Sequence, residues 1–166
     1  MSTGAEAPRP KADEAPKRHS KERTAPPPAG SGSISLSFAP SNDRALEKLL
    51  HSLEETGFFQ QLVLELDGWV KLPSKLSASF EPCGQMNAFY DRNERKMIVC
   101  HEMVAKFAEI FAEDEERSEE EIGLAILGAT TFFFLHEFGH ALVHLLELPI
   151  TGKEEDAVDE LATLAM

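Results

Sequence analysis

Three short segments of the chain read as strands, most clearly where apolar residues alternate with small polar ones, as in half-buried strands. They are residues 34–38 (ISLSF), 76–80 and 97–100. A turn rich in Asp, Arg and Asn, at 91–93, precedes the last segment, so the region between Cys83 and Cys100 is predicted to form a hairpin. We therefore expect a small sheet that is largely antiparallel.

Between and after these strands, apolar residues recur with the spacing of helices. Pro40 ends the first strand, and leucines at helical spacing continue as far as Gly57. A second helical segment, 58–66, follows directly, and the pattern after the last strand is helical throughout. Ser118 and Glu121 form a capping box, which predicts the start of a helix that runs into the most apolar part of the chain. The fold class that this pattern predicts is α+β.

Composition and charge exclude several classes of function. Asp and Glu number 29 against 16 Lys and Arg, a formal charge of −13, which disfavours binding to nucleic acid and to anionic membrane surfaces. The longest apolar stretch, 122–135, is shorter than the roughly 18 residues of a spanning helix, so no membrane span is expected. Residues 1–33 are rich in Pro, Ala, Ser and charge and are predicted to be a tail, either a tether or a basic docking segment. Their start lacks the apolar region of a secretory signal.

The strongest chemical signal is FFFLHEFGHALVHLLELP at 132–149. Its apolar residues cover most of a helix surface, so His136, Glu137 and His140 are expected in a buried helix, where unpaired polar groups are costly. A divalent metal would resolve that conflict. Histidines at i and i+4 project from one face and suit a tetrahedral zinc, and Glu137 can reach a metal-bound water as general base without being a ligand.

The segment after this helix contains the remaining candidate ligands. Thr151 and Glu154 form a second capping box, which predicts a helix that turns back on the first. Glu155 is then well placed as a third zinc ligand. Asp159, one turn later, could accept a hydrogen bond from a ligand histidine and fix its tautomer. Alternatively, EEDAVDE is the solvated acidic face of a terminal helix.

These motifs resemble a largely bacterial metallopeptidase family that is named from a domain of unknown function. The resemblance extends from about residue 34 to the end and includes HEFGHALVHLLELPITGKEEDAVDELATL, an upstream Cys-Gly, Asn-Ala-Phe-Tyr and a second Cys. It implies a zincin-like fold of the gluzincin type, in which HExxH pairs with ExxxD. Transferred to this sequence, it implies His136, His140 and Glu155 as ligands, Glu137 as base and Asp159 as orienter. It also implies export and a chain that continues further.

Cys83 and Cys100 are the only cysteines. Each lies near the end of a predicted strand, so a disulfide is one interpretation and a pair of buried free thiols in a reducing compartment is the other. The segment 87–90 (NAFY) is either a strand edge that pairs with an extended peptide or part of a hairpin that holds core aromatic residues.

Other residues near the motif have plainer interpretations. His144 lies too far along the helix to share an ion with His136 and His140, so a structural role is expected. Gly139 is either simply tolerated in the helix or permits a close backbone approach. His101, which follows the second cysteine, is interpreted as a helix start.

The sequence as a whole therefore predicts one zincin-like domain at 34–166. It consists of a small antiparallel sheet packed on helices, and is either truncated after Met166 or closed by packing of the last apolar helix face. The predicted function is zinc-dependent hydrolysis of peptide bonds in a peptide or protein substrate, with Zn²⁺ as cofactor. The alternative is a non-catalytic, zinc-stabilised domain that binds a partner protein.

Overall fold

The computed structural model describes residues 34–166, so the predicted tail at 1–33 lies outside the described residues. This part of the chain contains four strands and five helices, in the order β1 (Ile34–Phe38), α1 (Arg44–Glu55), α2 (Phe58–Trp69), β2 (Leu76–Glu81), β3 (Ala88–Asp91), β4 (Lys96–Cys100), α3 (His101–Ala112), α4 (Glu119–Leu145) and α5 (Glu154–Ala165). The predicted helices and strands are confirmed, including the helix start at His101. The fold class is α+β.

The sheet is mixed, and the prediction of a largely antiparallel sheet is wrong. The strand order is β1-β2-β4-β3, in which β1 pairs with β2 and β2 with β4 in parallel, and only β3 and β4 are antiparallel. Two helices lie between β1 and β2, and such a crossover returns the chain to the same end of the sheet. The β3–β4 hairpin reverses direction twice after β2, so β4 lies parallel to β2 and β3 becomes an edge strand.

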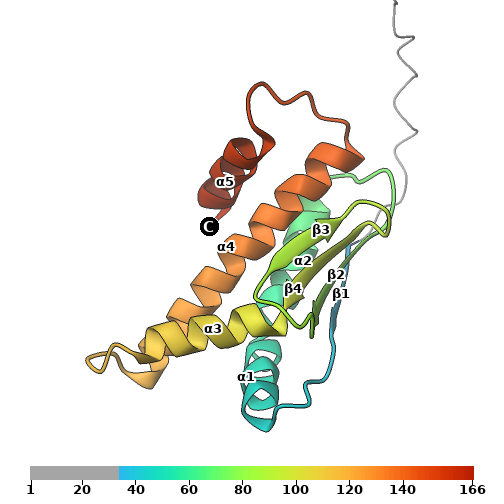
Figure 1. Cartoon of the computed structure of the whole chain (residues 1–166). Coiled ribbons are helices and arrows are strands. Elements are labelled where there is room, and N and C mark those ends of the chain that lie inside the picture. Colours follow the sequence, from blue (N-terminus) through green and yellow to red (C-terminus); the bar gives the residue numbers. More distant parts are fainter. Residues whose placement is uncertain (1–33) are drawn as a thin grey trace, which may run out of the picture.

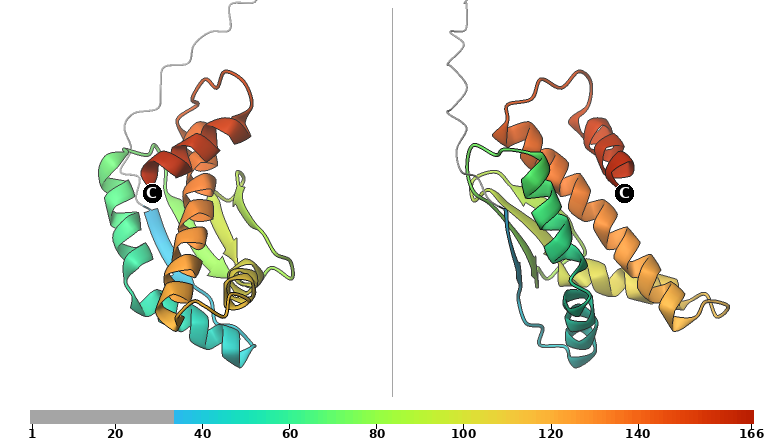
Figure 2. Two further views of the ribbon diagram at one scale, coloured as in Figure 1. Left: turned by 90° about the vertical axis from the view of Figure 1, so that its left-hand side faces the viewer. Right: turned by 180° about the vertical axis from the view of Figure 1, so that it is seen from behind.

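The core lies between one face of the sheet and the helices α2 and α4 (Figures 1 and 2). Phe59 of α2, Phe80 of β2 and Phe134 of α4 are almost completely buried and meet there, with ring centroids 5.0 to 6.5 Å apart. On the opposite face of the sheet, β1 presents the exposed Ser35 and Ser37. The alternation along the strands therefore directs the apolar side chains toward α2 and α4.

Helix α4 is the central element of the fold. Its first turn has the predicted capping box, in which the side chains of Ser118 and Glu121 each accept a hydrogen bond from the other residue's backbone N–H. By length and composition alone, α4 is the one helix among the described residues that could cross a membrane. A core helix meets the same criteria, and α4 lies between the sheet and α5 (Figure 1). The absence of a membrane span stays a prediction.

Helix α5 returns along the outer side of α4 (Figure 2). Its predicted Thr151 cap is wrong, because the N-cap residue is Lys153 and no side chain caps the helix. The two helices approach each other closely at Gly139. A Cβ atom there would lie 2.8 Å from Cβ of the buried Val158. Of the two interpretations of Gly139, simple tolerance and a close approach of another segment, the structure therefore supports the close approach.

Candidate metal centre and active site

The second half of α4 presents two imidazoles one turn apart. His136 and His140 project toward α5, and their Nε2 atoms are 3.2 Å apart. Both side chains are largely buried, with 15% of each exposed. The local sequence explains this arrangement, because residues at i and i+4 lie on the same face of a helix.

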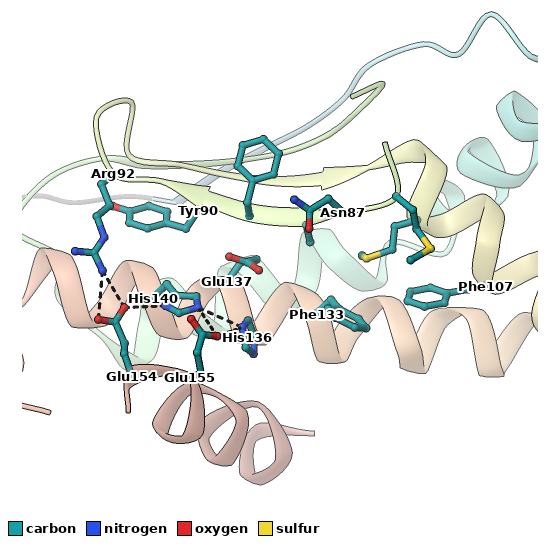
Figure 3. Close-up of a pocket in the computed structure, with 14 residues that line it drawn as sticks. Asn87, Tyr90, Arg92, Phe107, Phe133, His136, Glu137, His140, Glu154 and Glu155 are labelled. Atoms are coloured by element: carbon teal, nitrogen blue, oxygen red, sulfur yellow. Dashed lines mark hydrogen bonds and ion pairs between the residues drawn. The ribbon is translucent and has the colours of Figure 1, made fainter. Parts of the chain in front are cut away.

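Helix α5 brings a carboxylate to the same point. Oε2 of Glu155 lies 3.3 Å from Nε2 of His136 and 3.5 Å from Nε2 of His140. Figure 3 shows Glu155 reaching from α5 toward the two rings. The structure therefore brings together the three residues that the sequence predicts as metal ligands.

Each imidazole is oriented through its other nitrogen. Nδ1 of His136 lies 2.8 Å from Oδ1 of Asp159, the residue predicted to orient a ligand. Nδ1 of His140 lies 2.8 Å from Oε1 of Glu154, which also accepts a hydrogen bond from Arg92 at 3.0 Å. The hydrogen bond from His140, aided by Arg92, lowers the pKa of Glu154 below its ordinary value. Glu154 is thus a site residue, and its predicted role in a capping box is wrong.

The donor set fits a divalent cation such as zinc. An ionised carboxylate only accepts hydrogen bonds, so each neutral imidazole carries its proton on Nδ1 and leaves Nε2 as an acceptor. When both imidazoles are in this form, two acceptor nitrogens and a carboxylate oxygen lie 3.2 to 3.5 Å apart and repel one another, so a cation among them would be stabilising. Ligand atoms at zinc-binding distances of about 2.0–2.1 Å in a tetrahedron are about 3.3–3.4 Å apart, which matches this triangle.

Glu137 differs from the three donors in position and in burial. Only 6% of its surface is exposed, and its side chain points from α4 toward β3 (Figure 3). Burial raises the pKa of Glu137 above its ordinary value, although His136, His140 and the backbone N–H of Tyr90 act in the opposite direction. A carboxyl group with a raised pKa, beside the donor triangle and outside it, suits proton transfer.

These groups line a cleft of about 650 Å³ between β3, α4 and α5. The NAFY segment forms its upper wall, and Asn87 and Tyr90 are close to the cleft in Figure 3. Within residues 34–166, β3 pairs with β4 on one side only, so its outer edge is an unpaired sheet edge beside the site. The hairpin interpretation of NAFY holds in part, because the aromatic ring of Tyr90 packs against the core. Pairing of this edge with a peptide stays a prediction.

Comparison with protein families agrees with this geometry. A family model, DUF4344, described as a putative metallopeptidase, matches residues 38–166. The chain belongs to this family. The match covers all the elements from the end of β1 to α5, including the cleft. The family description implies a metal-dependent hydrolase of peptide bonds. Neither the curated proteins nor the solved structures contain a match to the chain.

Three residues that the sequence singled out lie outside the donor triangle. Nδ1 of His144 is 2.9 Å from the Tyr90 hydroxyl, so His144 links α4 to β3, as a structural residue does. Cys83 and Cys100 form a disulfide between the loop after β2 and the end of β4. The carboxylate of Glu102 accepts hydrogen bonds from the backbone N–H groups of Cys83 and Gly84 and so holds the same loop.

Sequence reasoning missed two features of the site. One is the presence of Arg92, and the other is the orienting role of Glu154. Arg92 is 62 residues from Glu154 along the sequence, and nothing in its local pattern marks it. For Glu154 a signal was available. Each of the two ligand histidines needs a hydrogen-bond partner for its Nδ1 atom. Asp159 can serve only one of them, so the other histidine requires a second acceptor. An adjacent acid was therefore a candidate.

Proposed function

We propose that the chain is a zinc-dependent peptidase of the gluzincin type, in which His136, His140 and Glu155 hold the metal and Glu137 is the general base. The observation that carries the proposal is the convergence of three acceptor atoms beside a buried glutamate that is not one of them. Membership of the metallopeptidase family supports it. The ExxxD pattern of α5 supports the gluzincin assignment, because Asp159 contacts a ligand histidine.

The residues of the site divide the chemical work. Zinc, when bound, supplies a Lewis acid that lowers the pKa of water and polarises a carbonyl group. Glu137 accepts a proton from the attacking water as its oxygen bonds to the scissile carbonyl carbon. Glu137 then gives the proton to the amine nitrogen as the carbon–nitrogen bond breaks. Asp159 and Glu154 keep both Nε2 atoms directed toward the centre.

An extended peptide is the substrate that fits the cleft best. The outer edge of β3 offers unpaired backbone groups along one wall, and a peptide can add to such an edge as a further strand. The Asn87 side chain adds a polar group at the start of the same strand. A peptide bound in this way would pass directly over Glu137.

The experiment measures zinc content and cleavage of casein by the full chain and by Glu137→Gln. We expect the wild type to bind zinc and cleave casein, and Glu137→Gln to bind zinc without cleavage. Glu155→Ala should lose the metal, whereas Glu160→Ala, a matched change at an exposed position on α5, should keep both properties. Zinc binding without hydrolysis by the wild type would support the non-catalytic alternative. Undiminished hydrolysis by Glu137→Gln would refute the role of Glu137.

A further inference from the structure

The two ends of the cleft differ in chemistry (Figure 3). At one end Arg92 pairs with Glu154. The other end, beyond His136 and Glu137, is lined by the apolar side chains of Met86, Met103, Phe107 and Phe133. Among the described residues that line this second end, none carries a charge. We call these four side chains the apolar end.

The apolar end is a shaped surface rather than a scattered set of exposed residues. The rings of Phe133 and Phe107 stack with centroids 5.6 Å apart and form its floor. Met86 stands at its mouth with 61% of its surface exposed, and Phe133 is 36% exposed. The loop that carries Met86 is held by the disulfide and by Glu102. Exposed apolar side chains held in this way beside a cleft indicate a binding surface.

The position of the apolar end relates it to the scissile bond. Phe133 precedes His136 by three residues, which is about 4.5 Å along a helix. An extended peptide advances about 3.3 Å per residue. A peptide whose scissile carbonyl lies at the donor triangle therefore brings a neighbouring side chain over Phe133.

We propose that the apolar end is a specificity subsite, which selects peptides with a large aliphatic or aromatic side chain next to the scissile bond. This inference rests on the proposed function, since it assumes that a peptide lies along β3. Burial of a leucine or phenylalanine side chain against this surface should tighten binding by about tenfold to hundredfold relative to alanine. Met86 and Phe133 supply the selective contact.

The test is a binding measurement that does not depend on hydrolysis. Zinc-loaded, full-length Glu137→Gln, labelled at the methionine methyl groups, is titrated with Gly-Gly-Phe-Gly-Gly and with Gly-Gly-Ala-Gly-Gly and followed by NMR. We expect the phenylalanine peptide to shift the methyl signals of Met86 and Met103 and to bind at least about tenfold more tightly than the alanine peptide. Met166 is the internal control, because it is 65% exposed but lies at the end of α5.

A second variant asks whether the contact is selective. Met86→Glu, at an exposed position, should weaken binding of the phenylalanine peptide about tenfold and favour the corresponding lysine peptide. Equal affinities for the phenylalanine and alanine peptides, or shifts at Met166 as large as those at Met86, would overturn the proposal. Because binding is read on a variant without its base, a failure here is distinct from a failure of the Glu137 experiment.

Discussion

Replacement of Gly139 by alanine tests how closely α4 and α5, the two halves of the proposed metal centre, are coupled. The added Cβ would lie 2.8 Å from both Cβ and Cγ1 of Val158 and 3.2 Å from Cδ2 of Leu161. Carbon atoms in ordinary contact are about 3.5–4.0 Å apart. Because Val158 is buried and its Cβ is attached to the backbone, α5 must retreat by about 1 Å.

Two effects of opposite sign set the size of the change. Alanine is favoured over glycine in a helix by about 1 kcal/mol. Overpacking a tight contact costs about 1–3 kcal/mol. Glu155 lies three residues before Val158, so the retreat also displaces a predicted ligand, and metal sites tolerate only about 0.2 Å. We expect Gly139→Ala to be neutral or to lower the free energy of unfolding by up to about 2 kcal/mol, and to weaken zinc binding at least about tenfold.

Gly128 provides a matched control on the same helix. Among the described residues, no atom outside the local helix backbone lies within 4 Å of a Cβ at this position. Gly128→Ala should therefore raise the free energy of unfolding by up to about 1 kcal/mol and leave zinc affinity unchanged. Unfolding in urea with excess zinc and competition with a chelator measure the two quantities. If Gly139→Ala is as stable as Gly128→Ala and binds zinc equally well, the helix contact does not position the site.

Three further predictions concern residues around the cleft. Glu154→Ala and Asp159→Asn should each weaken zinc binding by about 10–100-fold, as measured by chelator competition. If Glu154→Ala binds zinc as tightly as the wild type, Glu154 does not orient a ligand. Replacing Cys83 and Cys100 together by serine should lower the free energy of unfolding in urea by about 3 kcal/mol, a loss that an unchanged midpoint would contradict. Burial opposes but does not outweigh the backbone hydrogen bonds that lower the pKa of Glu102. Its ionised form therefore stabilises the fold above about pH 4.5, and this contribution is lost as the pH falls. In Glu102→Gln, the free energy of unfolding should fall less steeply as the pH is lowered below about 4.5. A pH dependence identical to that of the wild type would refute this role of Glu102.

The features that could be predicted from the sequence are those set by neighbours along the chain. The i, i+4 spacing of His136 and His140 and the Ser118 capping box depend only on helix geometry, and both are present in the structure. The same holds for the β3–β4 hairpin, whose turn is local. The relative direction of β2 and β4 could not be predicted in this way, because it depends on where the long connections between the strands run.

Glu154 shows how a local rule can fail. Its position three residues after Thr151 is typical of a capping box, but its carboxylate contacts His140 and Arg92 instead. A charged hydrogen bond within the site competes with a cap worth about 1 kcal/mol, and the sequence does not show the competing partner. The pairing of the cysteines was equally undetermined, because it depends on the register that brings the loop after β2 to the end of β4.

The docking of α5 has a consequence for the response of the chain to metal supply. Among the described elements, α5 packs mainly on α4, and the polar contacts between the two helices join His136 and His140 of α4 to carboxylates of α5. A metal bound at the proposed centre would therefore stabilise mainly the packing of α5 on α4, because the sheet contributes no residue to the donor triangle. Removal of the metal should therefore loosen α5 alone, so that backbone amides of α5 exchange with solvent long before those of β2 or β4. Loss of metal would then release α5 from a body that stays folded.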